Sequence, residues 1–161
     1  MAQKIFQVLD DSPTIYWGKN IYTAAGQTAV EPGMLVQRTS GSTVSLNTTT
    51  TIPLGFAYGL RYAAYRPTTV VFDAGEAITI VQGRGLALVS SDFFTGGTLP
   101  ASGDTLVTGL TGLMDPTSGY GAYKVGKCLR IEPYSAFTGG TGTAQTVALI
   151  QFEFSPFGTG S

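Results

Sequence analysis

Few residues in this chain are of types that can do covalent or acid–base chemistry, and one run of them resembles a phosphate-binding loop. Residues 121–127 (GAYKVGK) match the glycine and lysine spacing of such a loop, but Cys128 stands where the loop has the Ser or Thr that holds magnesium. A phosphate loop must also open a helix, because the amides at the helix N-terminus bind the phosphate. Residues 129–132 (LRIE) instead continue as a strand pattern that stops at Pro133. We therefore interpret the match as coincidental and the run as a turn.

Two further groups have spacings that could support chemistry. Asp73 and Glu76 flank a two-residue turn and could form an acid–base pair of carboxylates. No catalytic partner stands beside them, so we interpret them as turn formers. Residues 83–85 (GRG) lack the third glycine and the following helix of a dinucleotide-binding fingerprint. They predict a tight hairpin with Arg84 at its tip.

The residue types that most often build catalytic and metal sites are scarce. The chain has no histidine, which removes His-containing metal sites and Ser–His or Cys–His nucleophiles. Its one cysteine, Cys128, lies in a strand-like run and is expected to be a small buried hydrophobe. A single cysteine forms no internal disulfide, so no oxidising compartment is implied. We expect no catalytic residue, no metal and no cofactor, and hence a protein that is not an enzyme.

Composition favours a protein that associates with others. Charged residues are 12% of the 161 residues, about half of the usual ~25%, and the formal net charge is −1. Surfaces near neutrality associate readily. The lack of a basic excess argues against nucleic acid as a partner. No apolar run approaches the ~20 residues that cross a bilayer, and the N-terminus lacks the apolar block of a signal peptide, so we expect synthesis in a cytoplasm and no membrane partner.

Hydrophobic periodicity predicts that the chain is almost entirely β. Short alternating runs are separated by turns that contain glycine and proline, which is typical of a sandwich or barrel. In the last run, Ala148, Ile150, Phe152 and Phe154 share one face. The fold class that this predicts is an all-β, compact β-barrel or sandwich of short antiparallel strands over residues 31–154. The expected strands cover residues 34–37, 43–47, 53–58, 69–72, 76–81, 85–89, 105–107, 122–131 and 146–154.

The two ends of the chain fall outside that pattern. Residues 1–30 are predicted to form an extended N-terminal arm, and residues 155–161 a flexible C-terminal tail. The arm carries large apolar residues that an isolated barrel would cover poorly, and such residues usually mark an interface. The alternative is that they belong to the chain's own core. The candidate interface residues for a capsid or a sister subunit are Phe6, Ile15, Tyr16, Trp17, Ile21 and Tyr22.

The order of the short elements resembles a known family. The resemblance runs through residues 31–36 (EPGMLV), 53–57 (PLGFA), 74–80 (AGEAITI), 83–87 (GRGLA), 101–107 (ASGDTLV) and 123–129 (YKVGKCL). In this order and spacing they resemble the capsid decoration, or cement, proteins of tailed bacteriophages. The resemblance spans roughly residues 31–154. The N-terminal arm and residues 61–68 depart from the family's pattern.

The resemblance implies a non-enzymatic virion protein on the outer capsid surface. Its partner would be the major capsid protein, whose contacts it would stabilise, and it would form a homotrimer, with a homodimer as the alternative. Strand addition at an interface and repetition over many symmetric copies fit that role. Two other classes remain open. One is another phage part, such as a tail-tube or fibre domain. The other is a carbohydrate-binding or hydrolytic β domain that uses Trp17 or a tyrosine as a sugar platform.

Overall fold

The computed structural model is built almost entirely from β-strands. It describes residues 4–9, 13–16, 22–23, 30–58, 72–116, 123–134 and 145–154. Within these ranges the helical content is limited to three single-turn 3-10 helices, η2 (Ser91–Phe93), η3 (Thr95–Gly97) and η4 (Leu110–Gly112). The predicted all-β fold class is confirmed.

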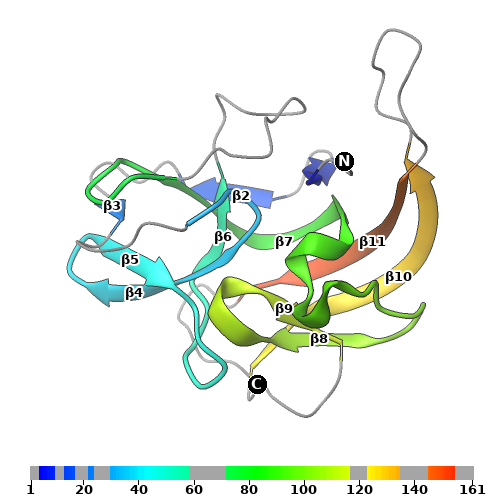
Figure 1. The fold of residues 1–161 in the computed structure, drawn as a ribbon. Coiled ribbons are helices and arrows are strands. Elements are labelled where there is room, and N and C mark those ends of the chain that lie inside the picture. Colours follow the sequence, from blue (N-terminus) through cyan, green and yellow to red (C-terminus); the bar gives the residue numbers. More distant parts are fainter. Residues whose placement is uncertain are drawn as a thin grey trace, which may run out of the picture.

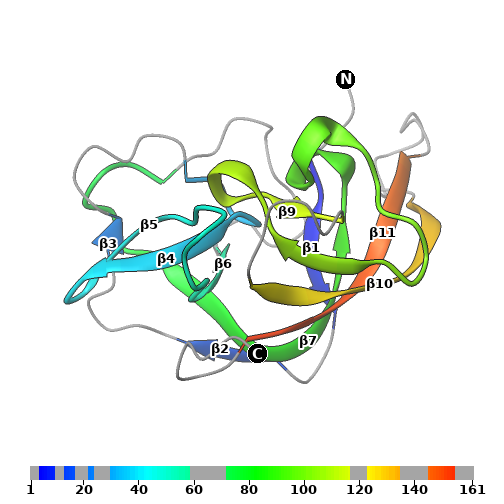
Figure 2. The same cartoon turned by 90° about the horizontal axis from the view of Figure 1, so that it is seen from below.

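Eleven strands form one sheet that curls into a half-barrel (Figure 1). Along the main path the order is β3-β5-β4-β6-β7-β11-β10-β8-β9, and every pairing is antiparallel except that of β3 with β5. Figure 2 shows β3, β4 and β5 at one end of the molecule and β10 and β11 at the other, with β7 between them. The bounds are β1 (Phe6–Leu9), β2 (Pro13–Tyr16), β3 (Tyr22–Thr23), β4 (Leu35–Ser40), β5 (Thr43–Leu46), β6 (Gly55–Tyr58), β7 (Thr79–Val89), β8 (Thr105–Thr108), β9 (Met114–Asp115), β10 (Lys124–Tyr134) and β11 (Gln145–Glu153).

The strand β7 runs without interruption from Thr79 to Val89 and joins the two halves of the sheet. The prediction of a hairpin with Arg84 at its tip is therefore wrong. Residues 79–83 pair with β2 and β6, whereas residues 84–89 pair with β11 and, from residue 86, with β1. Gly83 lies between the two parts with φ +79°, and its carbonyl accepts a hydrogen bond of 2.8 Å from the Phe154 amide. A glycine takes this left-handed conformation at little cost, so the strand bends without ending. Glycine occurs both in hairpin turns and at bends within a strand, so the sequence pattern did not distinguish the two.

The main core lies inside the curl of the sheet and centres on Phe56 of β6. Its ring centroid is 4.8 Å from that of Phe6, 5.4 Å from Phe152 and 5.1 Å from Phe154. All four predicted same-face residues of the last run are buried in this cluster, so that prediction is confirmed. Alternation along β11 sends every second side chain into the core, as the period of a strand requires.

The described parts of the N-terminal arm belong to the sheet of their own chain. Strands β1 and β2 pair with successive parts of β7. Ile5 and Ser90 are joined by two hydrogen bonds of 2.9 Å, one from the Ser90 amide to the Ile5 carbonyl and one from the Ile5 amide to the Ser90 hydroxyl. Lys4 forms a half-buried ion pair of 2.7 Å with Glu31. In its described parts, the predicted extended arm therefore pairs with its own sheet, and Phe6 lies in the core, which was the alternative to an interface. The physical reason is that β7 has amide and carbonyl groups on two edges, and both edges need partners.

Some sequence predictions fall on residues outside the described ranges. These include the tail at residues 155–161 and most of the strand expected at residues 69–72, of which Phe72 forms an isolated bridge with Val30. Among the described residues, no helix is long and apolar enough to span a bilayer.

Candidate interaction surfaces

The run that resembled a phosphate loop is strand from Lys124 onward, which agrees with the strand predicted at residues 122–131 and not with the turn interpretation of the run. Lys127 lies in β10 opposite Thr105 of β8 and Gln151 of β11. Gly126 allows close strand contact, because a Cβ atom there would lie 2.1 Å from the Gln151 carbonyl oxygen. The glycine therefore serves sheet packing. A strand presents no row of helix amides to a phosphate.

The paired carboxylates Asp73 and Glu76 hold a turn together. The Asp73 amide donates to the Glu76 carboxylate at 2.9 Å, and the Glu76 amide donates to the Asp73 carbonyl at 3.0 Å. The Glu76 amide also donates to the Thr23 hydroxyl at 3.1 Å. These bonds agree with the interpretation of the two acids as turn formers. Among the described residues, no group of three His, Cys, Asp or Glu side chains could hold a metal ion.

Cys128 lies fully buried in the main core, as predicted for a small hydrophobe. Burial raises the pKa of its thiol, and the nearby Asp104 charge raises that pKa further, whereas a contact with the Arg130 carbonyl lowers it. A thiol with a raised pKa is a weak nucleophile, because the thiolate is the reactive form.

Of the six candidate interface residues of the N-terminal arm, only Phe6 has a side chain within the part of the chain that the structure describes. Phe6 lies in the main core with 8% of its surface exposed. Ile15 and Tyr16 are placed by the pairing of β2 with Val81 and Ile80 of β7. The remaining three are distributed as follows: Tyr22 lies in β3 opposite Thr43, whereas Trp17 and Ile21 lie outside the described residues.

Sequence reasoning missed a set of leucines on the other face of the sheet. Leu86 and Leu88 alternate along β7 with the core residues Ala87 and Val89, so they point away from the main core. Leu88 pairs with Leu149 across to β11, and both belong to a separate small cluster. Leu86, further along the same face, is 36% exposed. The alternation of two apolar sets in residues 86–89 could have revealed this second apolar face.

Leu129 is a second exposed leucine in the same part of the sheet. It is the extra residue of an irregularity in β10, between Cys128 and Arg130, and 41% of its surface is exposed. A bulge of this kind turns one side chain out of the regular alternation. We call Leu86 and Leu129 together the exposed leucine pair.

Two ion pairs lie near the exposed leucine pair. Arg84 of β7 bonds to Glu153 of β11 at 3.0 Å, and Arg130 bonds to Glu132 within β10 at 2.8 Å. Exposed ion pairs of this kind contribute little to stability. The exposed Lys127, which lies in β10 opposite Gln151 and two residues before Leu129, forms no ion pair within the described residues, so the region keeps one unpaired positive charge. Apolar side chains with polar and charged side chains around them are the usual anatomy of a protein interface.

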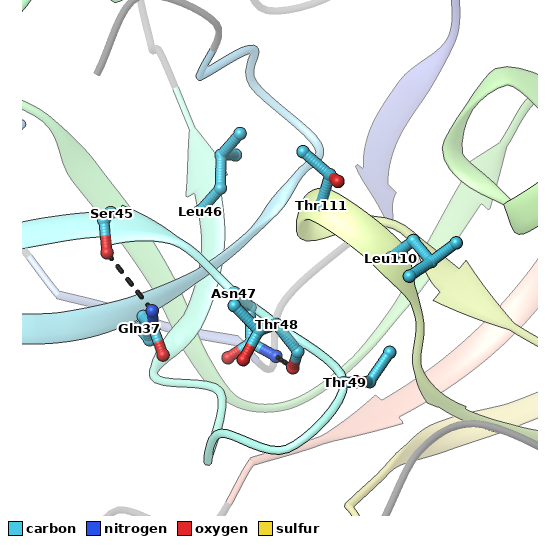
Figure 3. Close-up of a pocket in the computed structure, with 8 residues that line it drawn as sticks. All are labelled: Gln37, Ser45, Leu46, Asn47, Thr48, Thr49, Leu110 and Thr111. Atoms are coloured by element: carbon cyan, nitrogen blue, oxygen red, sulfur yellow. Dashed lines mark hydrogen bonds between the residues drawn. The ribbon is translucent and has the colours of Figure 1, made fainter. Parts of the chain in front are cut away.

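A separate open groove lies between the loop after β5 and η4 (Figure 3). Its volume is about 430 Å³. Gln37 and Ser45 lie on one side, and Leu110 and Thr111 come from the facing segment (Figure 3). All described residues that line the groove are uncharged: Gln37, Ser45, Leu46, Asn47, Thr48, Thr49, Leu110 and Thr111.

Hydrogen bonds join the two walls of the groove. The Gly112 amide donates to the Asn47 carbonyl at 2.8 Å, and the Thr108 hydroxyl donates to the Thr49 carbonyl at 3.2 Å. The Asn47 side chain is buried and donates to the Thr48 and Thr51 carbonyls at 2.6 Å and 3.2 Å. These contacts link segments about sixty residues apart, so no local sequence pattern could have indicated the groove.

The chain was compared with protein-family models and with curated proteins, and neither comparison assigns a function to these surfaces. No protein-family model matches the chain. No curated protein matches it either.

Proposed function

We propose that this protein is a non-enzymatic structural protein of a tailed-phage virion. It binds the outer surface of the head and stabilises contacts between major capsid proteins. The proposal is supported by the order of motifs over residues 31–154, which resembles that of decoration proteins, and by the low charge of an all-β chain. Such a role needs a rigid fold and a surface that associates, and it needs no reaction centre.

The observation on which the proposal rests is the exposed leucine pair. Leu86 and Leu129 belong to two of the longest strands, which pair on either side of β11. Full burial of a leucine side chain contributes about 1.5–3 kcal/mol. Since Leu86 and Leu129 are 36% and 41% exposed, the remaining gain per residue is about 1 kcal/mol.

A burial free energy of about 1 kcal/mol per leucine is suited to a weak contact that is repeated in every copy of the protein. One copy contributes little by itself, but a bound oligomer multiplies its contacts, so its avidity for a shell exceeds the affinity of one copy. We therefore propose a homo-oligomer, with a trimer favoured and a dimer as the alternative. The major capsid protein is the proposed second partner.

The test adds the purified protein to expanded heads that lack it and measures co-sedimentation. The expected result is saturable binding with a fixed number of copies per head. Replacing Leu86 and Leu129 together by serine should weaken binding by about tenfold or more, since about 2 kcal/mol of burial is lost. Ile52→Ser is the matched control, because Ile52 is also an exposed apolar residue, at 42%, but lies in a different segment.

The outcomes separate the proposal from its closest rival. Ring or tube formation by the protein alone, without head binding, would identify a tail-tube component instead. Equal binding by the double serine variant and the wild type would remove the exposed leucine pair from the interface.

A further inference from the structure

The groove beside η4 presents hydrogen-bonding groups that the rest of the described chain does not use. The hydroxyls of Thr49 and Thr111 make no hydrogen bond within the described residues. The amide nitrogen of Gln37 donates to the Ser45 hydroxyl at 3.3 Å, which leaves the Gln37 carbonyl oxygen as an acceptor. Figure 3 shows these side chains arranged around the opening. The groove therefore offers hydroxyls, which both donate and accept, beside one amide acceptor.

The backbone around the groove is held in place before any ligand arrives. Thr111 has φ +50°, and among the described residues it is the single non-glycine residue with a positive φ. A β-branched residue in this region is strained, and such strain persists only where surrounding contacts fix the chain. The next residue, Gly112, is fixed against Leu46 and the Leu35 carbonyl, because a Cβ atom there would lie 2.8 Å and 3.0 Å from them.

The uncharged polar and apolar residues that line the groove indicate which class of ligand it can bind. No described lining residue is charged, so the groove offers nothing to pair with a phosphate, a carboxylate or an ammonium group. Leu46 and Leu110 supply apolar surface beside the hydroxyls, and Leu110 is 50% exposed. A neutral ligand that combines hydroxyl groups with C–H faces fits both features. The volume of about 430 Å³ lies within the usual range for small-molecule sites.

We propose that this groove binds neutral carbohydrate, one or two sugar rings at a time. The hydroxyls of Thr49 and Thr111 and the Gln37 carbonyl bond to sugar hydroxyls, and Leu110 packs against a C–H face. A peptide is the less suitable occupant. An extended peptide binds through main-chain hydrogen bonds to the edge of a sheet, whereas the described groove offers two isolated hydroxyls. The proposal is independent of head binding, since the groove and the exposed leucine pair involve different residues.

The test is a titration of the ¹⁵N-labelled full chain with D-glucose, D-galactose, D-mannose, N-acetyl-D-glucosamine, maltose and lactose, followed by NMR. We expect at least one sugar to shift the amide signals of residues 47–49 and 110–112 saturably. An open, neutral site of this kind predicts a dissociation constant on the order of millimolar. Thr49→Val, which removes a hydroxyl at nearly constant volume, should weaken binding at least fivefold. Thr105→Val is the matched control at an exposed strand position outside the groove.

Three results would overturn the proposal. The first is the absence of saturable shifts in the groove with every sugar tested up to about 50 mM. The second is a Thr49→Val variant that binds the sugar as tightly as the wild type and the Thr105→Val control do. The third is an equal response to glycerol, which would show that the groove accepts any small polyol. A spectrum of Thr49→Val without sugar checks the fold, and Thr111→Gly provides a second variant if Thr49→Val does not fold.

Discussion

The placement of Phe6 in the main core leads to a specific prediction about the N-terminal arm. Phe6 is 8% exposed, and its ring lies 4.8 Å from that of Phe56 and 5.9 Å from that of Phe93. Truncation of a buried phenylalanine to alanine costs about 3–5 kcal/mol. Because Phe6 sits near the start of the arm and keeps some exposure, we expect Phe6→Ala to cost about 3 kcal/mol, at the low end of that range.

The assay is urea unfolding followed by circular dichroism, with thermal unfolding as a second readout. A loss of about 3 kcal/mol corresponds to a fall in Tm of roughly 6–12 °C for a domain of this size. Gln7→Ala is the matched control on the same strand. Gln7 is half-buried and accepts a long hydrogen bond of 3.3 Å from Tyr134, so its loss should cost less than about 1 kcal/mol.

The same pair of variants distinguishes a core role from an interface role. If Phe6 instead anchors the protein to a capsid or a sister subunit, Phe6→Ala leaves the stability of the isolated chain unchanged and weakens binding. Unchanged stability within about 0.5 kcal/mol, with reduced head binding, would refute the reasoning from the core.

Three further predictions concern the sheet, the groove and pH. Gly126→Ala should destabilise the protein by about 3 kcal/mol in urea unfolding, because its Cβ would lie 2.1 Å from the Gln151 carbonyl oxygen and force the strands apart; a loss below about 1 kcal/mol would contradict this close contact. Thr111→Gly should stabilise by about 1 kcal/mol in the same assay, because glycine removes the strain at φ +50°; a loss of stability would show that the strain is absent. The free energy of unfolding should fall as pH rises above about 9, because burial raises the folded-state pKa values of Cys128 and Tyr58, so the unfolded chain loses these protons first; a flat profile up to pH 10.5 would contradict it.

Local alternation predicted the strands that lie in the middle of the sheet. The face shared by residues 148–154 was correct because every second residue of β11 enters one core. Cys128 was correctly placed as buried, and the residues on either side of it, Lys127 and Leu129, are exposed. In these strands the local pattern and the tertiary packing agree, and so sequence reasoning succeeds.

The errors arose where tertiary contacts decide the structure. A glycine with positive φ serves a hairpin and a bent strand equally well, so residues 83–85 gave no means of choosing between them. The pairing of β1 and β2 with β7 depends on an edge formed more than sixty residues later in the chain. The groove depends on bonds between the loop after β5 and η4, and the exposure of Leu129 depends on an irregularity in β10. None of these features leaves a local periodic signal.

Binding to expanded phage heads that lack the protein tests the central proposal most directly. The purified chain should co-sediment with such heads up to a fixed, symmetric number of copies, and the decorated heads should then withstand a higher temperature than the undecorated ones. The double serine variant at Leu86 and Leu129 should bind at least tenfold more weakly than Ile52→Ser. Absence of binding by the folded wild-type protein to heads of its own phage would contradict the proposed function.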